Sequence, residues 1–123
     1  MDRVMANESP LLRSIQIALS RIGARVFRNN VGVLKDARGR HVRYGLAVGS
    51  SDLIGWAPVK VDESMVGKTL AVFMAVEVKA GRTRVSKGQE DFLAAVRTAG
   101  GIAVVARGEG EAVAAISLLR GES

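Results

Sequence analysis

Two charged side chains stand at the end of the most apolar segment of the sequence. Glu77 and Lys79 lie two residues apart within Ala75–Arg82. Because residues i and i+2 of a strand point to the same face, the two side chains are expected side by side, with Val78 turned to the other face. Residues 70–76 are apolar on both faces, which is typical of a strand in the buried centre of a sheet. Burying a carboxylate and an ammonium there costs free energy unless they are paired, solvated or used in chemistry.

Asp52 offers a second carboxylate, at the start of another apolar segment over residues 52–57. If this strand pairs antiparallel with the Glu77 strand, the two carboxylates converge. They would repel each other unless a cation lay between them, and oxygen ligands suit Mg²⁺ or Mn²⁺. Such an ion polarises a phosphodiester and lowers the pKa of bound water. Lys79 would hold or deprotonate that water, or neutralise charge on the phosphorane oxygens.

The same residues also have a plainer interpretation. An aspartate followed at a distance by a Glu-x-Lys pattern occurs by chance in many proteins. Glu77 and Lys79 can form a self-neutralising pair at a strand end, worth about 0–1 kcal/mol. Spacing alone leaves both interpretations open.

The elements that would position these residues alternate between helices and strands. Ser9 followed by Pro10 predicts a helix start, and Gly23 its end. Ser86 and Gln89 form the capping-box pattern of a second helix. Apolar periodicity predicts strands over 25–28, 52–57, 69–79 and 102–106, helices over 9–23, 86–99 and 111–119, and a basic hairpin or loop over 35–43 around Gly39. This order predicts an α/β fold with a restriction-endonuclease-like α-β-β-β-α-β core, in which helices flank a mixed central sheet.

Length and composition limit the class of protein. With 123 residues the chain is expected to form one domain, residues 1–123. It has no apolar run long enough for a membrane span and no secretory signal pattern, so a cytoplasmic location in a bacterium or phage-infected host is the expectation. The absence of cysteine and the single histidine, His41, exclude thiolate metal sites and argue against a zinc hydrolase.

The net charge of +6 favours a polyanionic partner. The positive residues cluster around the hairpin and directly after Lys79, with a looser group that includes Arg28. A solvated basic surface kept for solubility is the alternative interpretation, but clusters that flank a candidate site favour phosphate contacts. The predicted nucleic-acid contacts are Arg28, Asn30, Lys35, Arg38, Arg40, Arg43, Ser51, Arg82, Arg84 and Lys87.

Several motifs, taken together, resemble the VRR-NUC domain family, a branch of the PD-(D/E)XK nuclease superfamily. The resemblance runs over nearly the whole chain, although no single motif is specific. It is carried by Ile15–Gln16, Phe27–Gly32, Gly49–Gly55, Glu77–Arg82, Ser86–Leu93 and Gly100–Gly101.

The resemblance implies a role for each site residue. Asp52 and Glu77 would bind Mg²⁺ or Mn²⁺, with the Val78 carbonyl as a further ligand, and Lys79 would be the catalytic lysine. Gln89 would have a fitted role near the site, although its capping box with Ser86 is an equal alternative. Two further residues have weaker implied roles that compete with plain structural ones: Glu8 as a metal ligand or a solvated acid, and Asn30 as a site or a turn residue.

The resemblance also implies a function. Small stand-alone members resemble phage proteins and are thought to act as homodimers on branched DNA, so a structure-selective, Holliday-junction-resolvase-like endonuclease is the expectation. A restriction or nicking nuclease acting on ordinary duplex DNA is one rival. A non-catalytic nucleic-acid-binding module is the other, and metal-dependent cleavage distinguishes it from an enzyme.

Overall fold

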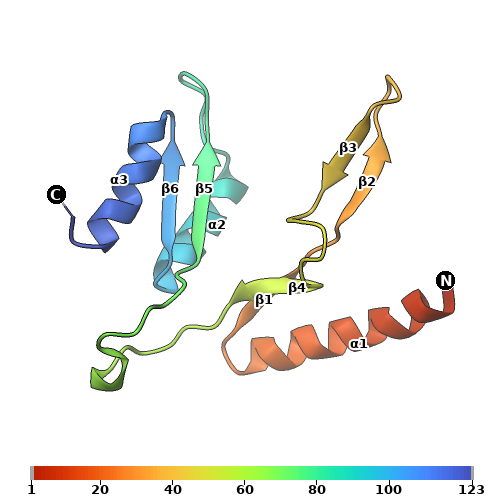
Figure 1. Cartoon of the computed structure of the whole chain (residues 1–123), viewed down its shortest axis with the longest axis horizontal. Helices are drawn as coiled ribbons and strands as arrows, with labels where there is room; N and C mark the ends of the chain where they lie inside the picture. Colours follow the sequence, from red (N-terminus) through yellow and green to blue (C-terminus); the bar gives the residue numbers. More distant parts are fainter. Residues whose placement is uncertain (1, 123) are drawn as a thin grey trace. The chain divides into compact units, whose positions relative to one another are not determined.

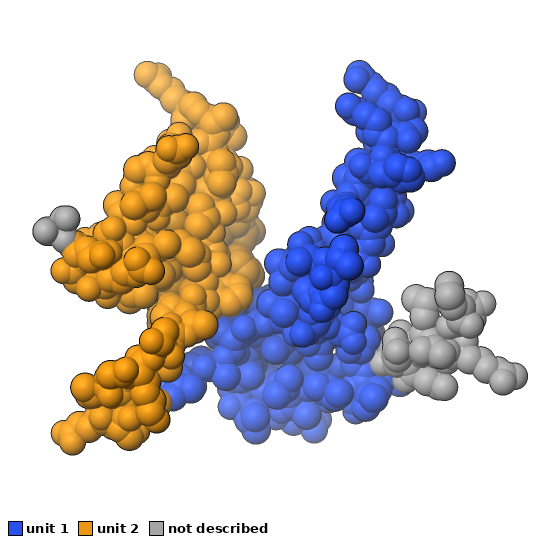
Figure 2. All heavy atoms as spheres, in the orientation of Figure 1, with its two compact units in different colours: residues 1–59 blue, residues 60–123 orange. Residues whose placement is uncertain are grey.

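The computed structural model describes the backbone of residues 2–122 and the side chains of residues 10–122. It is an α/β structure, as predicted, and it divides into two units, residues 1–59 and residues 60–123 (Figure 2). The elements follow one another as α1 (Asp2–Arg21), β1 (Arg25–Arg28), β2 (Gly32–Lys35), β3 (His41–Tyr44), β4 (Leu53–Trp56), the 3-10 helix η1 (Glu63–Met65), β5 (Met74–Val78), α2 (Lys87–Thr98), β6 (Ile102–Ala106) and α3 (Glu109–Leu119) (Figure 1).

Helix α1 begins earlier than its sequence predicts. It starts at Asp2, and Pro10 lies inside it, so the predicted start at Ser9 is wrong. The fixed φ of proline is compatible with a helix; the ring removes one backbone donor and crowds the preceding turn without always ending the helix. The predicted end is confirmed, because Gly23 adopts a positive φ of 93° just after the helix. Gln16 then ties the helix to β1 by donating from Nε2 to the Val26 carbonyl at 2.9 Å.

Strands β1 and β4 form an antiparallel pair in the first unit. Gly55 lies opposite Val26, and a Cβ at Gly55 would meet the Arg25 carbonyl oxygen and lie 2.6 Å from the Val26 Cα. The rings of Phe27 and Trp56 pack at 5.5 Å between centroids. The absence of a side chain at position 55 therefore allows the two backbones to approach.

The hairpin predicted around Gly39 is confirmed. Strands β2 and β3 pair antiparallel, with Lys35 opposite His41, and Gly39 has a φ of 79° in the turn that joins them. The side chain of Asp36 organises this turn. Its Oδ1 accepts hydrogen bonds from the backbone amides of Arg38 and Arg40, both at 2.9 Å.

The second unit is built on a parallel crossover. Strands β5 and β6 pair in parallel, and α2 connects them and packs on both; α3 packs beside β6 (Figure 1). The buried side chains among the described residues are Leu93, Val96 and Ala106, of which Val96 is fully buried. The predicted strand 102–106 is confirmed, whereas α3 begins at Glu109, two residues before its predicted start.

One prediction about the strands is wrong. The strand predicted over 69–79 is shorter, Met74–Val78, and its Val76 and Val78 are 39% and 75% exposed, because α2 packs on the opposite face and α3 on β6. The expected antiparallel pairing of the Asp52 and Glu77 strands would join β4 and β5, which belong to different units, and it stays a prediction. Within the two units, the described residues form three two-stranded sheets, β1–β4, β2–β3 and β5–β6. Apolar patterns show which faces of a strand can be buried, but not which strand is its neighbour.

None of the helices within residues 2–122 has the length and apolar composition that crossing a membrane requires.

Replacing Gly55 with alanine is expected to destabilise the first unit by about 1–3 kcal/mol, because the added Cβ collides with the β1 backbone. Urea denaturation followed by circular dichroism measures the effect. Gly110→Ala is the matched control, because nothing lies within 4 Å of a Cβ at that helical position. Equal stability of Gly55→Ala and wild type would show that β1 and β4 do not approach as described.

Candidate functional site

Glu77 and Lys79 share a face at the end of β5, as predicted. The Lys79 Nζ lies 3.8 Å from the Glu77 Oε2, and the two side chains are only 15% and 29% exposed for lysine and glutamate, respectively. The ion pair is therefore loose but partly shielded from water. Partial burial strengthens the electrostatic effect of both charges on any group that enters between them.

Gln89 fulfils both of the roles that its position in the sequence suggests. Its backbone amide donates to the Ser86 Oγ at 3.2 Å and its Oε1 accepts from the Ser86 amide at 2.9 Å, which completes the capping box of α2. Its Nε2 donates to the Glu77 Oε2 at 3.1 Å. One side chain thus caps the helix and fixes the carboxylate of the neighbouring strand.

Within the described residues, the polar contacts of the Glu77 side chain are all made by one of its oxygens. Gln89 and Lys79 both approach Oε2, and no donor among the described residues bonds to Oε1. A carboxylate held at one oxygen presents the other in a fixed direction. Together with a main-chain carbonyl such as that of Val78, it offers the oxygen donors that Mg²⁺ and Mn²⁺ prefer, and such ions keep waters in their remaining positions.

The described residues contain no cluster of three or more acidic, histidine or cysteine side chains that could hold a metal ion. In the second unit, Glu77 contacts both Lys79 and Gln89. Asp52 belongs to the first unit. The side chain of Glu8 lies outside the described residues. The metal-binding roles of Asp52, Val78 and Glu8 stay predictions.

Arg107 holds the loop that follows Lys79, a role that the sequence reasoning missed. Its Nη1 donates to the Gly81 carbonyl and its Nη2 to the Thr83 carbonyl, each at 2.7 Å. Its own amide donates to Glu111 at 2.8 Å. Arg107 directly follows β6, and the ends of parallel strands meet at one edge of a sheet, so this position was the signal that could have identified it.

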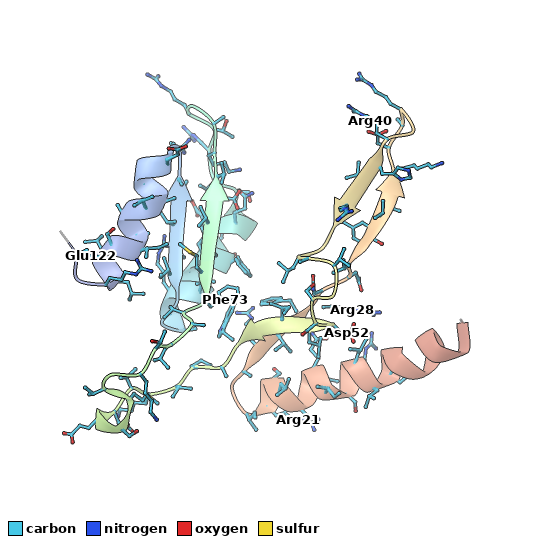
Figure 3. All side chains as sticks on the ribbon, in the orientation of Figure 1. Arg21, Arg28, Arg40, Asp52, Phe73 and Glu122 are labelled. Atoms are coloured by element: carbon cyan, nitrogen blue, oxygen red, sulfur yellow. The ribbon has the colours of Figure 1, made fainter. Side chains whose placement is uncertain are left out.

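Asn29 holds the backbone around Asp52, and the sequence did not predict this role either. Its amide donates to the Asp52 carbonyl at 2.8 Å, while its Nδ2 donates to the Ser50 Oγ and the Ser51 carbonyl at 2.7 and 2.9 Å. Its Oδ1 accepts from the Leu46 amide at 3.1 Å. Asn29 thus fixes the backbone of the exposed Asp52, which directly precedes β4 and is labelled in Figure 3.

Asn30, the asparagine predicted from the resemblance, has a local contact. Its Oδ1 accepts from the Arg28 Nε at 3.1 Å. The contact orients the Arg28 guanidinium at the end of β1 and leaves the predicted roles of both residues untested.

The predicted phosphate contacts differ in how their charges are compensated. Arg40 pairs with Asp36 at 3.0 Å, and Lys87 pairs with Asp91 at 2.6 Å. No ion pair or hydrogen bond within the described residues engages the other basic side chains of the hairpin and of the loop after Lys79. These are Lys35, Arg38, Arg43, Arg82 and Arg84, all exposed. Ser51 is exposed as well.

Asp36 makes the hairpin sensitive to acid. The hydrogen bond from the Arg40 amide, with those from the Arg38 amide and the Arg40 guanidinium, lowers the pKa of its carboxyl below the ordinary 3.8, although desolvation opposes the shift. The ionised form is the one that binds the donors. Its contribution to stability is therefore present above the ordinary pKa and is lost as the pH falls through the lowered value.

We expect the backbone amide signals of Arg38 and Arg40 to titrate together with a midpoint below 3.8 in ¹H–¹⁵N NMR spectra. In Asp36→Asn this titration should be absent. A midpoint at or above 3.8 would contradict the described turn.

The dual role of Gln89 can be tested with Gln89→Glu. A glutamate retains the cap to the Ser86 amide but faces Glu77 with an oxygen in place of the amide donor, so at pH 7 we expect a loss of about 1–2 kcal/mol in the free energy of unfolding. The loss should shrink at a pH low enough to protonate both carboxyls. Ser86→Ala removes the cap alone and should cost about 1 kcal/mol at either pH. A Gln89→Glu variant as stable as wild type at pH 7 would show that the bond to Glu77 is unimportant.

No curated protein and no solved structure is significantly similar to the chain. The family model of the VRR-NUC domain matches residues 7–110, a range that includes parts of both units. It contains Asp52, Glu77, Lys79 and Gln89, the four residues that the sequence predicts to carry the chemistry. The chain therefore belongs to the VRR-NUC domain family and carries a nuclease-type domain.

Proposed function

We propose that the protein is a divalent-metal-dependent DNA endonuclease that hydrolyses phosphodiester bonds. The observation that carries the proposal is the Glu77 carboxylate, held at one oxygen by Gln89 with Lys79 beside it, in a chain of a nuclease family. DNA is the partner that a nuclease-type domain implies, and the net charge of +6 agrees with it.

Each site residue has a proposed role. Glu77 and Asp52 hold Mg²⁺ or Mn²⁺, with the Val78 carbonyl and Glu8 as further ligands. The bound ion supplies Lewis-acid polarisation of the phosphodiester and a water of lowered pKa. Glu77 can serve as a ligand because Gln89 restricts it to one orientation, and an oriented ligand loses less entropy on binding.

Lys79 acts on the reacting phosphate in this proposal. Its ammonium is largely shielded from water, and one carboxylate oxygen at 3.8 Å neutralises it only in part. It therefore stabilises the negative charge that develops on the phosphorane oxygens as a water oxygen bonds to phosphorus and the ester P–O bond breaks. Arg107 keeps the next residues, Gly81–Thr83, in place and so limits the freedom of the exposed Arg82 to reach a phosphate.

The form of the substrate is a further part of the proposal. We propose a homodimer that selects branched DNA, as a Holliday junction resolvase does, because two copies place two sites across a junction and a short chain has little surface for reading bases. We also propose that residues 1–123 act as one nuclease domain, because the family match continues across the boundary between residues 59 and 60.

The experiment compares cleavage of matched linear, flapped and four-way-junction DNA with Mg²⁺, Mn²⁺ or chelator. Asp52→Asn and Glu77→Gln should each lower the metal-dependent rate by about 100-fold or more while DNA binding persists, since each removes a ligand worth several kcal/mol to the transition state. Glu63→Gln is the matched control, because it removes one exposed acid outside the site.

The outcome also chooses among the alternatives. Preferred cleavage of the four-way junction supports the resolvase, and equal cleavage of linear duplex supports a restriction or nicking nuclease. If wild type binds every DNA but cuts none with either metal, the catalytic proposal fails and a nucleic-acid-binding module takes its place. Light scattering of the purified protein measures the number of subunits.

A further inference from the structure

The two faces of the β2–β3 hairpin differ in chemistry. In the antiparallel register, Lys35 lies opposite His41 and Val33 opposite Arg43. Because directly opposite residues share a face and alternate residues of a strand do too, Lys35, His41 and Arg43 lie on one face, together with Val33. We call Lys35, His41 and Arg43 the basic face of the hairpin.

The other face of the hairpin is apolar. It carries Leu34 opposite Val42, and Gly32 opposite Tyr44. The Tyr44 ring lies directly over Gly32, where a Cβ would be 2.5 Å from the ring carbon Cζ. An aromatic ring that covers a glycine across two strands fixes their register, so the hairpin presents its basic face as an ordered surface.

The charges of the basic face are uncompensated within the described residues. The sole acid in the hairpin sequence is Asp36, and it is engaged by the turn amides and by the side chain of Arg40, which lies in the turn. Figure 3 shows Arg40 at the tip of the hairpin. No acidic side chain in the described part of the chain pairs with Lys35, His41 or Arg43, and all three are exposed. The exposed charges of Lys35 and Arg43 are therefore available to an anionic partner.

The dimensions of the hairpin restrict that partner. The major groove of B-DNA, about 12 Å wide, admits a two-stranded β-ribbon. Single strands are instead held by aromatic side chains on which bases stack. The basic face carries no Phe, Tyr or Trp, and Tyr44 lies on the opposite face over Gly32.

We propose that the β2–β3 hairpin docks with its basic face in the major groove of duplex DNA, where Lys35 and Arg43 contact phosphates. The inference rests on the proposed function for the identity of the polyanion as DNA. Two points are new: the bound DNA is double-stranded, and the basic face of the hairpin binds it. It also separates Lys35 and Arg43 from Arg40, which pairs with Asp36 and takes no part in docking.

The test measures binding to a labelled 20-base-pair duplex and to one of its single strands, in chelator and over a range of salt concentrations. For the duplex, the logarithm of the association constant decreases linearly with the logarithm of the salt concentration. In Lys35→Gln/Arg43→Gln the magnitude of this slope should be smaller than in wild type by about 2, one unit for each phosphate contact. The control Lys60→Gln/Arg120→Gln removes the same two kinds of charge from exposed positions outside the hairpin. Its slope should match that of wild type.

A third variant separates charge from folding. Lys35→Arg/Arg43→Lys exchanges the two residue types and keeps both charges, so its slope should also match that of wild type. Three results would overturn the proposal: an equal fall in the control, an equal fall on the single strand, or a fall in the charge-keeping variant.

The outcomes for docking and for catalysis are distinguishable. Binding is measured without metal, so a hairpin-dependent duplex affinity would stand even if no DNA were cut. Conversely, wild type could cleave DNA with metal while Lys35→Gln/Arg43→Gln leaves the affinity for the duplex unchanged. That result would retain the proposed function and reject the docking of the hairpin.

Discussion

The geometry of the site depends on one amide side chain, that of Gln89. A carboxylate at the end of an apolar strand needs donors, and a helix N-terminus needs acceptors. Gln89 supplies an Nε2 donor to Glu77 and an Oε1 acceptor to the Ser86 amide. Because the same side chain makes both bonds, the start of α2 and the orientation of Glu77 are fixed together. A change in either one would disturb the other.

The edge of the sheet where Glu77 and Lys79 lie is completed by a residue from β6. Parallel pairing sets Val78 beside Ala106, and Arg107 follows at once. Its guanidinium spans the carbonyls of Gly81 and Thr83, so the chain after Lys79 is tied to the strand next to it. The exposed Arg82 and Arg84 thus extend from a held loop. A basic group on a held loop loses less conformational entropy when it meets a phosphate than one on a free loop does.

In both units, uncharged amides do the positioning. Gln89 orients Glu77, and Asn29 joins Leu46, Ser50 and Ser51 around the backbone of Asp52. An amide donates and accepts without adding charge. Glu77 and the backbone of Asp52 are therefore positioned without any further charged group. In the hairpin, Asp36 and Arg40 form an ion pair in the turn, whereas Lys35 and Arg43 have no acidic partner among the described residues.

The sequence by itself determined the local features. The period-two spacing of Glu77 and Lys79, the capping box at Ser86 and the turn at Gly39 depend on neighbouring residues, and the structure has all three. The family, too, is determined by the sequence alone. The tertiary structure decided which strands pair and which donors reach across them. An apolar strand fits several neighbours equally well, and the pairing of β1 with β4 depends on backbone approach at Gly55. Arg107 and Asn29 make bonds to main-chain carbonyls of other segments, and a carbonyl is present at every residue. No side-chain pattern could therefore identify these partners before the chain was folded.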